Sequence, residues 1–211
     1  MIKTSMLFCL IICCIYCNGQ YPGYTLLNNP ESFKKSFAQA SATTVSIQSD
    51  FSQEKYLTML SEKIKSTGKF WYRKKDNLRM EYIQPFPYLM ILNAGTIFTK
   101  DGQRENKMSA GSNKVFQQVD RILLDCVGGT MLENHDFQSR IFDHTGSFLI
   151  EFKPLSKNLS SLYKNINIVI DKKDYSATSI EMFELSGDKT IIHFQNKVFN
   201  AQIPDSVFTI P

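Results

Sequence analysis

The stretch GKFWYRKKDNLRMEYIQPFPYLMILNAGTIFTKDG, residues 68–102, decides the fold of this chain. It divides into aromatic residues at 70–72, an alternating run at 78–82, an apolar run at 88–92 and a short run at 96–99. The intervening Asn, Asp and Gly residues tolerate the backbone angles of turns, and proline interrupts strand pairing. The stretch therefore predicts an antiparallel meander with one apolar face.

Alternation within the meander identifies the side chains on its apolar face. Leu78, Met80 and Tyr82 alternate with Arg79 and Glu81. Successive side chains of a strand point to opposite faces, so we expect the apolar set to face an interior and the charged set to face outward. The predicted cavity lining comprises Phe70, Tyr72, Leu78, Met80, Tyr82 and Met90. An ordinary filled core is the alternative to a cavity.

The rest of the chain adds strands of the same kind. One alternating run near the start places four residues on one side, namely Val45, Ile47, Ser49 and Phe51. Later strands are predicted at 140–142, 148–152, 166–170, 177–184 and 189–198. Residues 104–111 are polar and predict a loop. Many short strands at this spacing indicate an antiparallel sandwich or barrel rather than a parallel sheet.

Two helices are predicted beside the strands. Asn29-Pro30-Glu31 combines a good N-cap, a residue suited to the first helical position and an acid at the positive helix end. Phe33 and Phe37 follow at helical spacing, and this narrow apolar edge suits either core packing or a lid over a cavity. Ser112 begins a second, strongly amphipathic helix that ends at the glycine pair 128–129.

The start of the chain predicts a secretory leader. Lys3 supplies the positive charge, and the apolar run at 6–16 is shorter than the ~20 residues that span a membrane. Gly19 is a small residue suited to signal peptidase, so we expect cleavage after it. This division gives a leader at 1–19 and a single domain at 20–211, exported to the periplasm.

The cysteines indicate neither a disulfide nor a reactive thiol. Of the five, only Cys126 lies outside the leader, and a lone cysteine forms no intramolecular disulfide. A small buried hydrophobe on the second helix is the simplest role for it. Acylation of Cys13 or Cys17 is the competing hypothesis for the leader, although neither follows a good lipobox.

Charge and motifs exclude several classes of function. The net charge of +4, or about +3 once Lys3 is removed with the leader, is too small to indicate nucleic-acid binding. His135, His144 and His193 do not stand at metal-ligand spacing with another His or Cys. The sequence has no nucleophile elbow, phosphate loop or Rossmann fingerprint. We therefore predict no catalytic residues, no metal and no cofactor.

The order of features in residues 68–102 resembles the LolA family of periplasmic lipoprotein carriers. A glycine precedes an aromatic strand, basic residues, a turn and an alternating strand, and Gln84-Pro85 then leads to an apolar strand that ends in a Gly turn. The end of the chain, IPDSVFTIP at 203–211, is also similar to that of the family. The resemblance implies a mainly β fold: an incomplete, open antiparallel β-barrel with a few α-helices as a lid.

The resemblance also implies a function. A LolA-type protein would receive lipoproteins from an inner-membrane ABC-type releasing complex and hold their acyl chains in an apolar cavity. It would then cross the periplasm and deliver the cargo to an outer-membrane lipoprotein acceptor. Burial of acyl chains contributes ~0.8 kcal/mol per methylene, which suits an apolar cavity. The expected protein is a monomer that catalyses no reaction.

A basic residue after the aromatic strand is implied to act in handing the cargo onward. Alignment without gaps from Gly68 to Pro85 places that arginine on Lys74 and the following proline on Lys75, with Arg73 beside them. We assign cargo transfer to Arg73, Lys74 and Lys75 and expect them to contribute little to folding. Lysine lacks the planar fork of donors that arginine has, and solvated side chains that keep a sheet edge soluble are the alternative.

Three other functions are compatible with the sequence. A lipid-anchored acceptor of the same fold would differ in its mature N-terminus. A carrier of another envelope lipid, such as a glycolipid or a polyene precursor, would differ in its occupant. An enzyme of the cell envelope would require a catalytic constellation that the sequence does not display.

Overall fold

The structure is a computed structural model that describes residues 21–60, 62–74, 77–109, 122 and 124–211. Its strands are β1 (Thr25–Leu26), β2 (Ser46–Tyr56), β3 (Ile64–Arg73), β4 (Asn77–Gln84), β5 (Tyr88–Asn93), β6 (Thr96–Asp101), β7 (Arg104–Ser109), β8 (Phe137–Asp143), β9 (Ser147–Pro154), β10 (Tyr163–Asp171), β11 (Ala177–Glu184) and β12 (Lys189–Phe199). The helical elements are α1 (Glu31–Thr43), residues 124–128, η1 (Met131–Glu133), α3 (Lys157–Ser160) and η2 (Asp205–Phe208).

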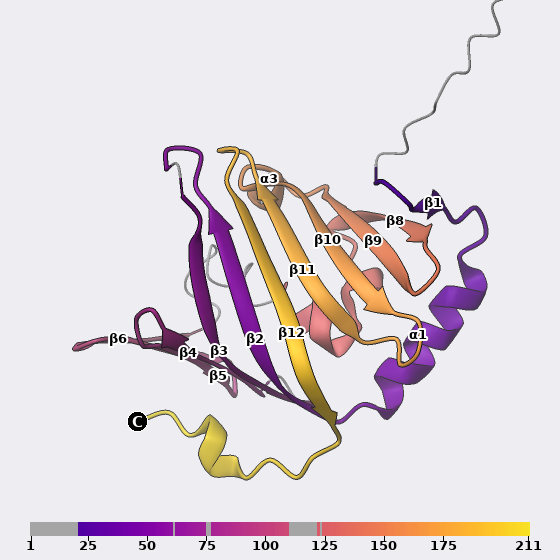
Figure 1. Cartoon of the computed structure of the whole chain (residues 1–211). Coiled ribbons are helices and arrows are strands. Elements are labelled where there is room, and N and C mark those ends of the chain that lie inside the picture. Colours follow the sequence, from indigo (N-terminus) through magenta and orange to yellow (C-terminus); the bar gives the residue numbers. More distant parts are fainter. Residues whose placement is uncertain (1–20, 61, 75–76, 110–121, 123) are drawn as a thin grey trace, which may run out of the picture.

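All twelve strands belong to one antiparallel sheet, in the order β1-β8-β9-β10-β11-β12-β2-β3-β4-β5-β6-β7. The late strand β12 pairs with the early strand β2, which joins the two halves of the chain. The sheet curls so that β4–β6 turn away from the upright β10–β12 (Figure 1). It stays open, with β1 and β7 as its two edge strands. The expected mainly β, incomplete barrel with helices on its open side is confirmed.

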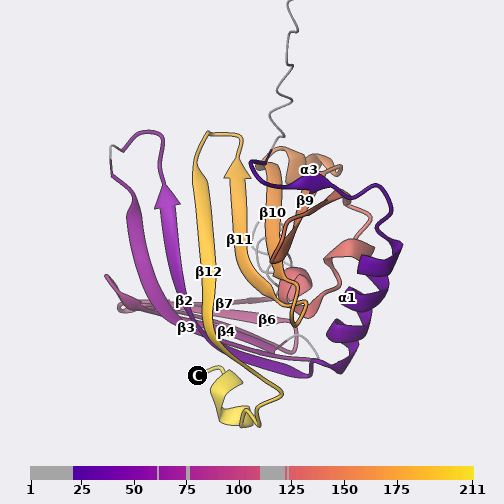
Figure 2. The same ribbon diagram turned by 45° about the vertical axis from the view of Figure 1, so that its right-hand side comes forward.

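Helix α1 lies beside the open side of the barrel, near β9 and β10 (Figure 2). It begins at Glu31, one residue later than expected, with Pro30 as N-cap; the side chain of Asn29 accepts a hydrogen bond from the Glu31 amide at 3.3 Å. Its two buried residues are Phe33 and Phe37, as the helical spacing predicted. Of the second predicted helix, only Ile122 and residues 124–128 are described, and both parts are helical.

Two sequence-based predictions differ from the structure or fall outside it. Residues predicted as a loop instead form β7, which pairs with β6 from Thr96↔Ser109 to Asp101↔Arg104. Its side chains are almost all exposed, because an edge strand is held by backbone hydrogen bonds and can carry charged residues on both faces. The predicted leader, with its cleavage site and cysteines, lies outside the described residues.

The C-terminal segment covers the outer face of the sheet. The amide of Asn93 donates a hydrogen bond to the carbonyl oxygen of Phe208 at 3.0 Å, and Arg79 donates one to that of Val207 at 3.2 Å. The ring of Phe208 is fully buried. This segment lies below β3–β5 in Figure 1, opposite the concave side. Part of the sheet is therefore covered on both faces.

Within the part of the chain that the structure describes, no helix combines the length and apolarity needed to cross a membrane.

Candidate functional site

The interior face of the curved sheet is built from cross-strand rows of apolar side chains. Phe70 on β3 pairs with Met80 on β4, which pairs with Met90 on β5. A second row runs from Tyr72 through Leu78 to Leu92 of β5. Because residues opposite each other in a ladder point to the same face, both rows meet on the concave side.

The predicted inward register is confirmed by burial. Phe70 and Leu78 are fully buried, Met80 nearly so, and Tyr72 and Met90 are buried as well. Tyr82 is half-buried and packs against the same core. The reverse register, with Trp71, Arg79 and Glu81 inside, does not occur: these three are half-buried on the outer face, where Arg79 contacts the C-terminal segment.

Tyr82 marks one end of the apolar face. Its hydroxyl donates a hydrogen bond to Oε1 of Gln53 at 2.9 Å, and its ring meets those of Phe51 and Tyr88 edge-on, with centroids 4.9 and 5.6 Å apart. Burial, with the nearby Tyr88, raises the pKa of Tyr82 well above its ordinary value. The phenol of Tyr82 therefore stays neutral. Its hydrogen bond to Gln53 lies at the end of the apolar face.

Helix α1 covers the interior through its aromatic edge. The ring of Phe33 meets that of Phe148 on β9 at 4.6 Å and that of Tyr175 at 6.0 Å, and it stacks on Phe37 at 5.5 Å. Aromatic pairs of this kind each contribute about 0.5–1.5 kcal/mol beyond area burial. Aromatic packing therefore joins this edge of α1 to β9 and to Tyr175.

Helical residues near Cys126 fill the interior next to α1. Ile122, Leu124 and Cys126 are all buried in the main core. Burial raises the pKa of the Cys126 thiol, with the neighbouring Asp125 carboxylate adding to the effect. The thiol is therefore protonated and inaccessible, in agreement with its predicted role as a small hydrophobe.

Among the described residues, the cavity that the interior side chains line against Phe70 is small. The cavity found against Phe70 measures about 10 Å³, which is close to the space that one water molecule needs. Sites for lipids or drug-sized ligands measure roughly 300–1,000 Å³. The predicted lining residues that the structure describes are thus brought together in one buried core.

The basic residues predicted for transfer lie elsewhere. Arg73 and Lys74 line an outer groove of about 520 Å³ between the start of β2 and the C-terminal segment. Arg73 donates hydrogen bonds to the carbonyl oxygen of Ile203 at 3.0 Å and to the Asp205 carboxylate at 2.6 Å, and its guanidinium lies 4.9 Å from the centre of the Phe208 ring. These contacts join Arg73 to the C-terminal segment, so we expect Arg73 to contribute to folding more than the sequence suggested.

Lys74 also has a structural contact, and Lys75 lies outside the described residues. The ammonium of Lys74 donates a hydrogen bond to the carbonyl oxygen of Ala42 at 2.6 Å. That carbonyl belongs to the last turn of α1, where carbonyl groups lack helical partners and cations are favourable. Lys74 is therefore linked to the covering helix rather than to the interior.

Replacement of Arg73 by glutamine should lower the free energy of unfolding by about 1–3 kcal/mol, because a charge-assisted hydrogen bond and a cation–π contact are lost. The same change at the more weakly tied Lys74 should cost no more than about 0.5 kcal/mol. Urea unfolding of both variants measures the difference. Equal stability of the two variants would contradict the anchoring role of Arg73.

Comparison with known families shows a match over residues 42–211 to the outer membrane lipoprotein carrier protein LolA. The chain belongs to the LolA family. The predicted resemblance is thereby confirmed, and the fold is that of lipid- or lipoprotein-binding carriers. Family membership points to a binding protein of the cell envelope rather than to an enzyme. Comparison with curated proteins finds no match.

Several solved structures are similar in fold. An uncharacterized conserved protein from Thermus thermophilus matches with a TM-score of 0.51 at 6% identity, over 87% of this chain and 95% of that one. A LolA superfamily protein from Nitrosomonas europaea matches with a TM-score of 0.45 at 8% identity, over 87% and 99%. The lipoprotein LppX from Mycobacterium tuberculosis matches with a TM-score of 0.46 at 11% identity, over 83% and 99%.

Two polar residues inside this LolA-family barrel were not predicted from the sequence as site residues. Ser49 of β2 and Lys197 of β12 line the cavity against Phe70. Ser49 was predicted on the apolar face of its strand, but no polar role was predicted for its hydroxyl. Lys197 was placed in an uninterrupted strand, and only Asn196 before it, a residue that tolerates a left-handed backbone, hinted at an irregularity. Among the described residues, no group of three or more His, Cys, Asp or Glu side chains could hold a metal.

Proposed function

We propose that this protein is a periplasmic carrier that binds the acyl chains of lipoproteins inside its open barrel and shuttles them from the inner to the outer membrane. One observation carries the proposal: a LolA-family barrel has apolar rows on its concave face, and a helix packs through its aromatic side chains against the open side of the same barrel. An acyl chain would take the place of these side chains on the concave face.

Helix α1 is the element that would move. The strands around the interior are joined by continuous backbone ladders, which are costly to break. By contrast, α1 buries Phe33 and Phe37, and exposing two such side chains costs about 3–6 kcal/mol. An acyl chain of about 16 carbons gains ~12 kcal/mol on full burial. Relative to an acyl chain exposed to water, exchange of the helix for the chain is therefore favourable.

The basic end of β3 would connect opening with transfer. Lys74 contacts the last turn of α1, and Arg73, the last residue of β3, contacts the C-terminal segment. Lys74 and Lys75 remain our candidates for transfer, because partner contacts at this end would act directly on the covering helix. The partners would be an inner-membrane ABC-type releasing complex and an outer-membrane lipoprotein acceptor, engaged by a monomeric domain of residues 20–211 after removal of the leader.

Native mass spectrometry of protein purified from the cell envelope tests the identity of the cargo. We expect an added mass equal to that of an acylated protein. Its acyl chains would have entered the barrel where Phe33 of α1 packs in the unbound protein. An added mass equal to that of a free lipid or glycolipid would support a carrier of another envelope lipid instead. Protein that carries neither, even after mixing with membranes that contain lipoprotein, would reject both.

Cell fractionation tests the direction of transport. In cells that lack the protein, a tagged outer-membrane lipoprotein should accumulate at the inner membrane. Normal delivery in these cells would show that this chain is not the carrier of that lipoprotein.

A further inference from the structure

A β-bulge on β12 directs the side chain of Lys197 toward the apolar interior. The pairing of β12 with β2 is regular up to Gln195↔Asp50 and resumes at Val198↔Gln48, so two residues of β12 oppose one residue of β2. Asn196, the first of the two, has a φ of +52°, and its amide donates a hydrogen bond to the Asp50 carboxylate at 2.9 Å. An inserted residue reverses the alternation of a strand beyond it.

The consequence is visible in the burial of β12. Before the bulge, Phe194 is buried and Gln195 is exposed. Within it, Asn196 is exposed and Lys197 is half-buried on the concave side, and Val198 after it is exposed. Without the bulge, Lys197 would share the outer face with Gln195. The bulge therefore places a long cationic side chain at a position where strand alternation alone would not.

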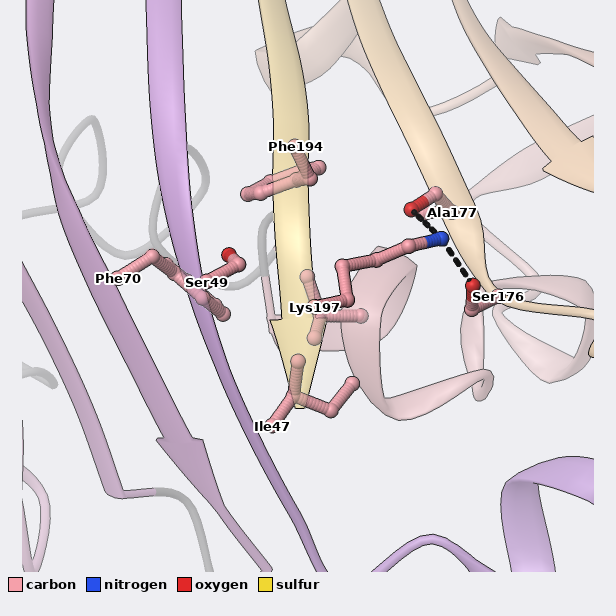
Figure 3. A pocket seen from close by; sticks show the side chains of 8 residues that line it. Ile47, Ser49, Phe70, Ser176, Ala177, Phe194 and Lys197 are labelled. Atoms are coloured by element: carbon pink, nitrogen blue, oxygen red, sulfur yellow. Dashed lines mark hydrogen bonds between the residues drawn. The ribbon is translucent and has the colours of Figure 1, made fainter. Parts of the chain in front are cut away.

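Lys197 extends from β12 toward the start of β11 within the small cavity (Figure 3). Its ammonium donates hydrogen bonds to the hydroxyl of Ser176 and, at 3.3 Å, to the carbonyl oxygen of Ala177. Burial lowers the pKa of Lys197, and the carboxylates of Asp174 and Asp171 oppose this effect. An ammonium has three N–H donors, so two of them are used by these contacts.

Ser49 faces the same cavity with an unsatisfied hydroxyl. Its side chain is buried, and its Oγ has no hydrogen-bond partner among the described residues. The other lining residues include the apolar Ile47, Phe70 and Phe194. A buried hydroxyl without a partner costs about 1–3 kcal/mol, so a group that completes its hydrogen bonding would bind favourably at this point.

We infer that Lys197, with Ser49 on the neighbouring strand, forms a polar subsite inside the barrel that binds the head of an acyl chain, with the ammonium donating to its carbonyl oxygen and the hydroxyl lying beside the bound head group. This inference rests on the proposed carrier function. It adds the position inside the barrel at which the head of the acyl chain would bind. The two polar groups lie on either side of β12, the ammonium toward the start of β11 and the hydroxyl on β2, and apolar side chains line the cavity with them (Figure 3). A carboxylate of a free fatty acid and an ester or amide carbonyl of a lipoprotein share this chemistry.

The test compares three fluorescent ligands on the full chain. cis-Parinaric acid carries a carboxylate, its methyl ester carries only a carbonyl, and diphenylhexatriene carries no oxygen. We expect Lys197→Met to weaken binding of the acid and the ester about tenfold and Ser49→Ala to weaken it about threefold, as loss of one hydrogen bond to each would do. Binding of diphenylhexatriene should not change. Lys153→Met, at an exposed position on β9, is the matched control.

Each outcome decides between alternatives. Weaker binding of the acid alone identifies a carboxylate ligand, and weaker binding of both acid and ester identifies an acyl carbonyl; either result supports the subsite. Wild-type affinity of both variants for all three ligands, or an equal loss for diphenylhexatriene, would overturn it and leave the carrier function standing. Thermal unfolding of each variant reports whether the fold is retained. A wild-type protein that binds none of the three ligands would overturn the carrier function itself.

Discussion

Replacement of Phe33 by alanine is expected to increase the affinity of the protein for diphenylhexatriene about tenfold while lowering its stability. The ring of Phe33 joins α1 to Phe148 and Tyr175. Its loss should cost about 3–5 kcal/mol of packing, as for other buried phenylalanines. If the interior accepts a ligand only when α1 moves away, weaker attachment raises the fraction of open molecules, and apparent affinity rises with that fraction. Fluorescence titration and urea unfolding measure the two effects.

Phe208→Ala is the matched control for this experiment. Phe208 is also buried, but it packs on the outer face of the sheet beneath Arg73. Its removal should lower stability by a similar amount without changing ligand affinity. An equal gain in affinity for both variants would show that the probe merely reports loosened packing. No gain for Phe33→Ala would contradict the role of α1 as a lid.

Replacement of Gly68 by alanine should destabilise the protein by about 3 kcal/mol or more, because the added methyl group has no space. A Cβ at this position would lie 2.1 Å from the backbone carbonyl oxygen of Glu81 and 2.7 Å from a ring carbon of Phe51. The glycine sits where the β3–β4 register shifts, between Thr67↔Gln84 and Gly68↔Tyr82. The backbone of β4 would have to move, and with it the row that carries Tyr82.

Thermal unfolding measures this effect. A loss of about 3 kcal/mol corresponds to a fall in Tm of about 10 °C for a domain of this size. Gly146→Ala is the control, because a Cβ there meets nothing within 4 Å. It should change stability by no more than about 0.5 kcal/mol. A Gly68→Ala protein as stable as the Gly146→Ala protein would show that the β3–β4 contact is looser than described.

The sequence by itself determined the local features of this protein. Alternation at Leu78, Met80 and Tyr82 identified the inward face correctly, because a strand has a period of two that does not depend on its neighbours. The spacing of Phe33 and Phe37 identified the buried edge of α1 for the same kind of reason. The order of turns and strands in residues 68–102 also sufficed to indicate the family.

Only the tertiary structure decided the features that depend on a distant partner. The pairing of β12 with β2, the strand nature of β7 and the hold of Arg73 on Asp205 involve segments that no local pattern connects. Lys197 is the clearest case. Its direction is reversed by a bulge whose register is defined by β2, a strand far away in the sequence, so its inward position depends on how two strands meet.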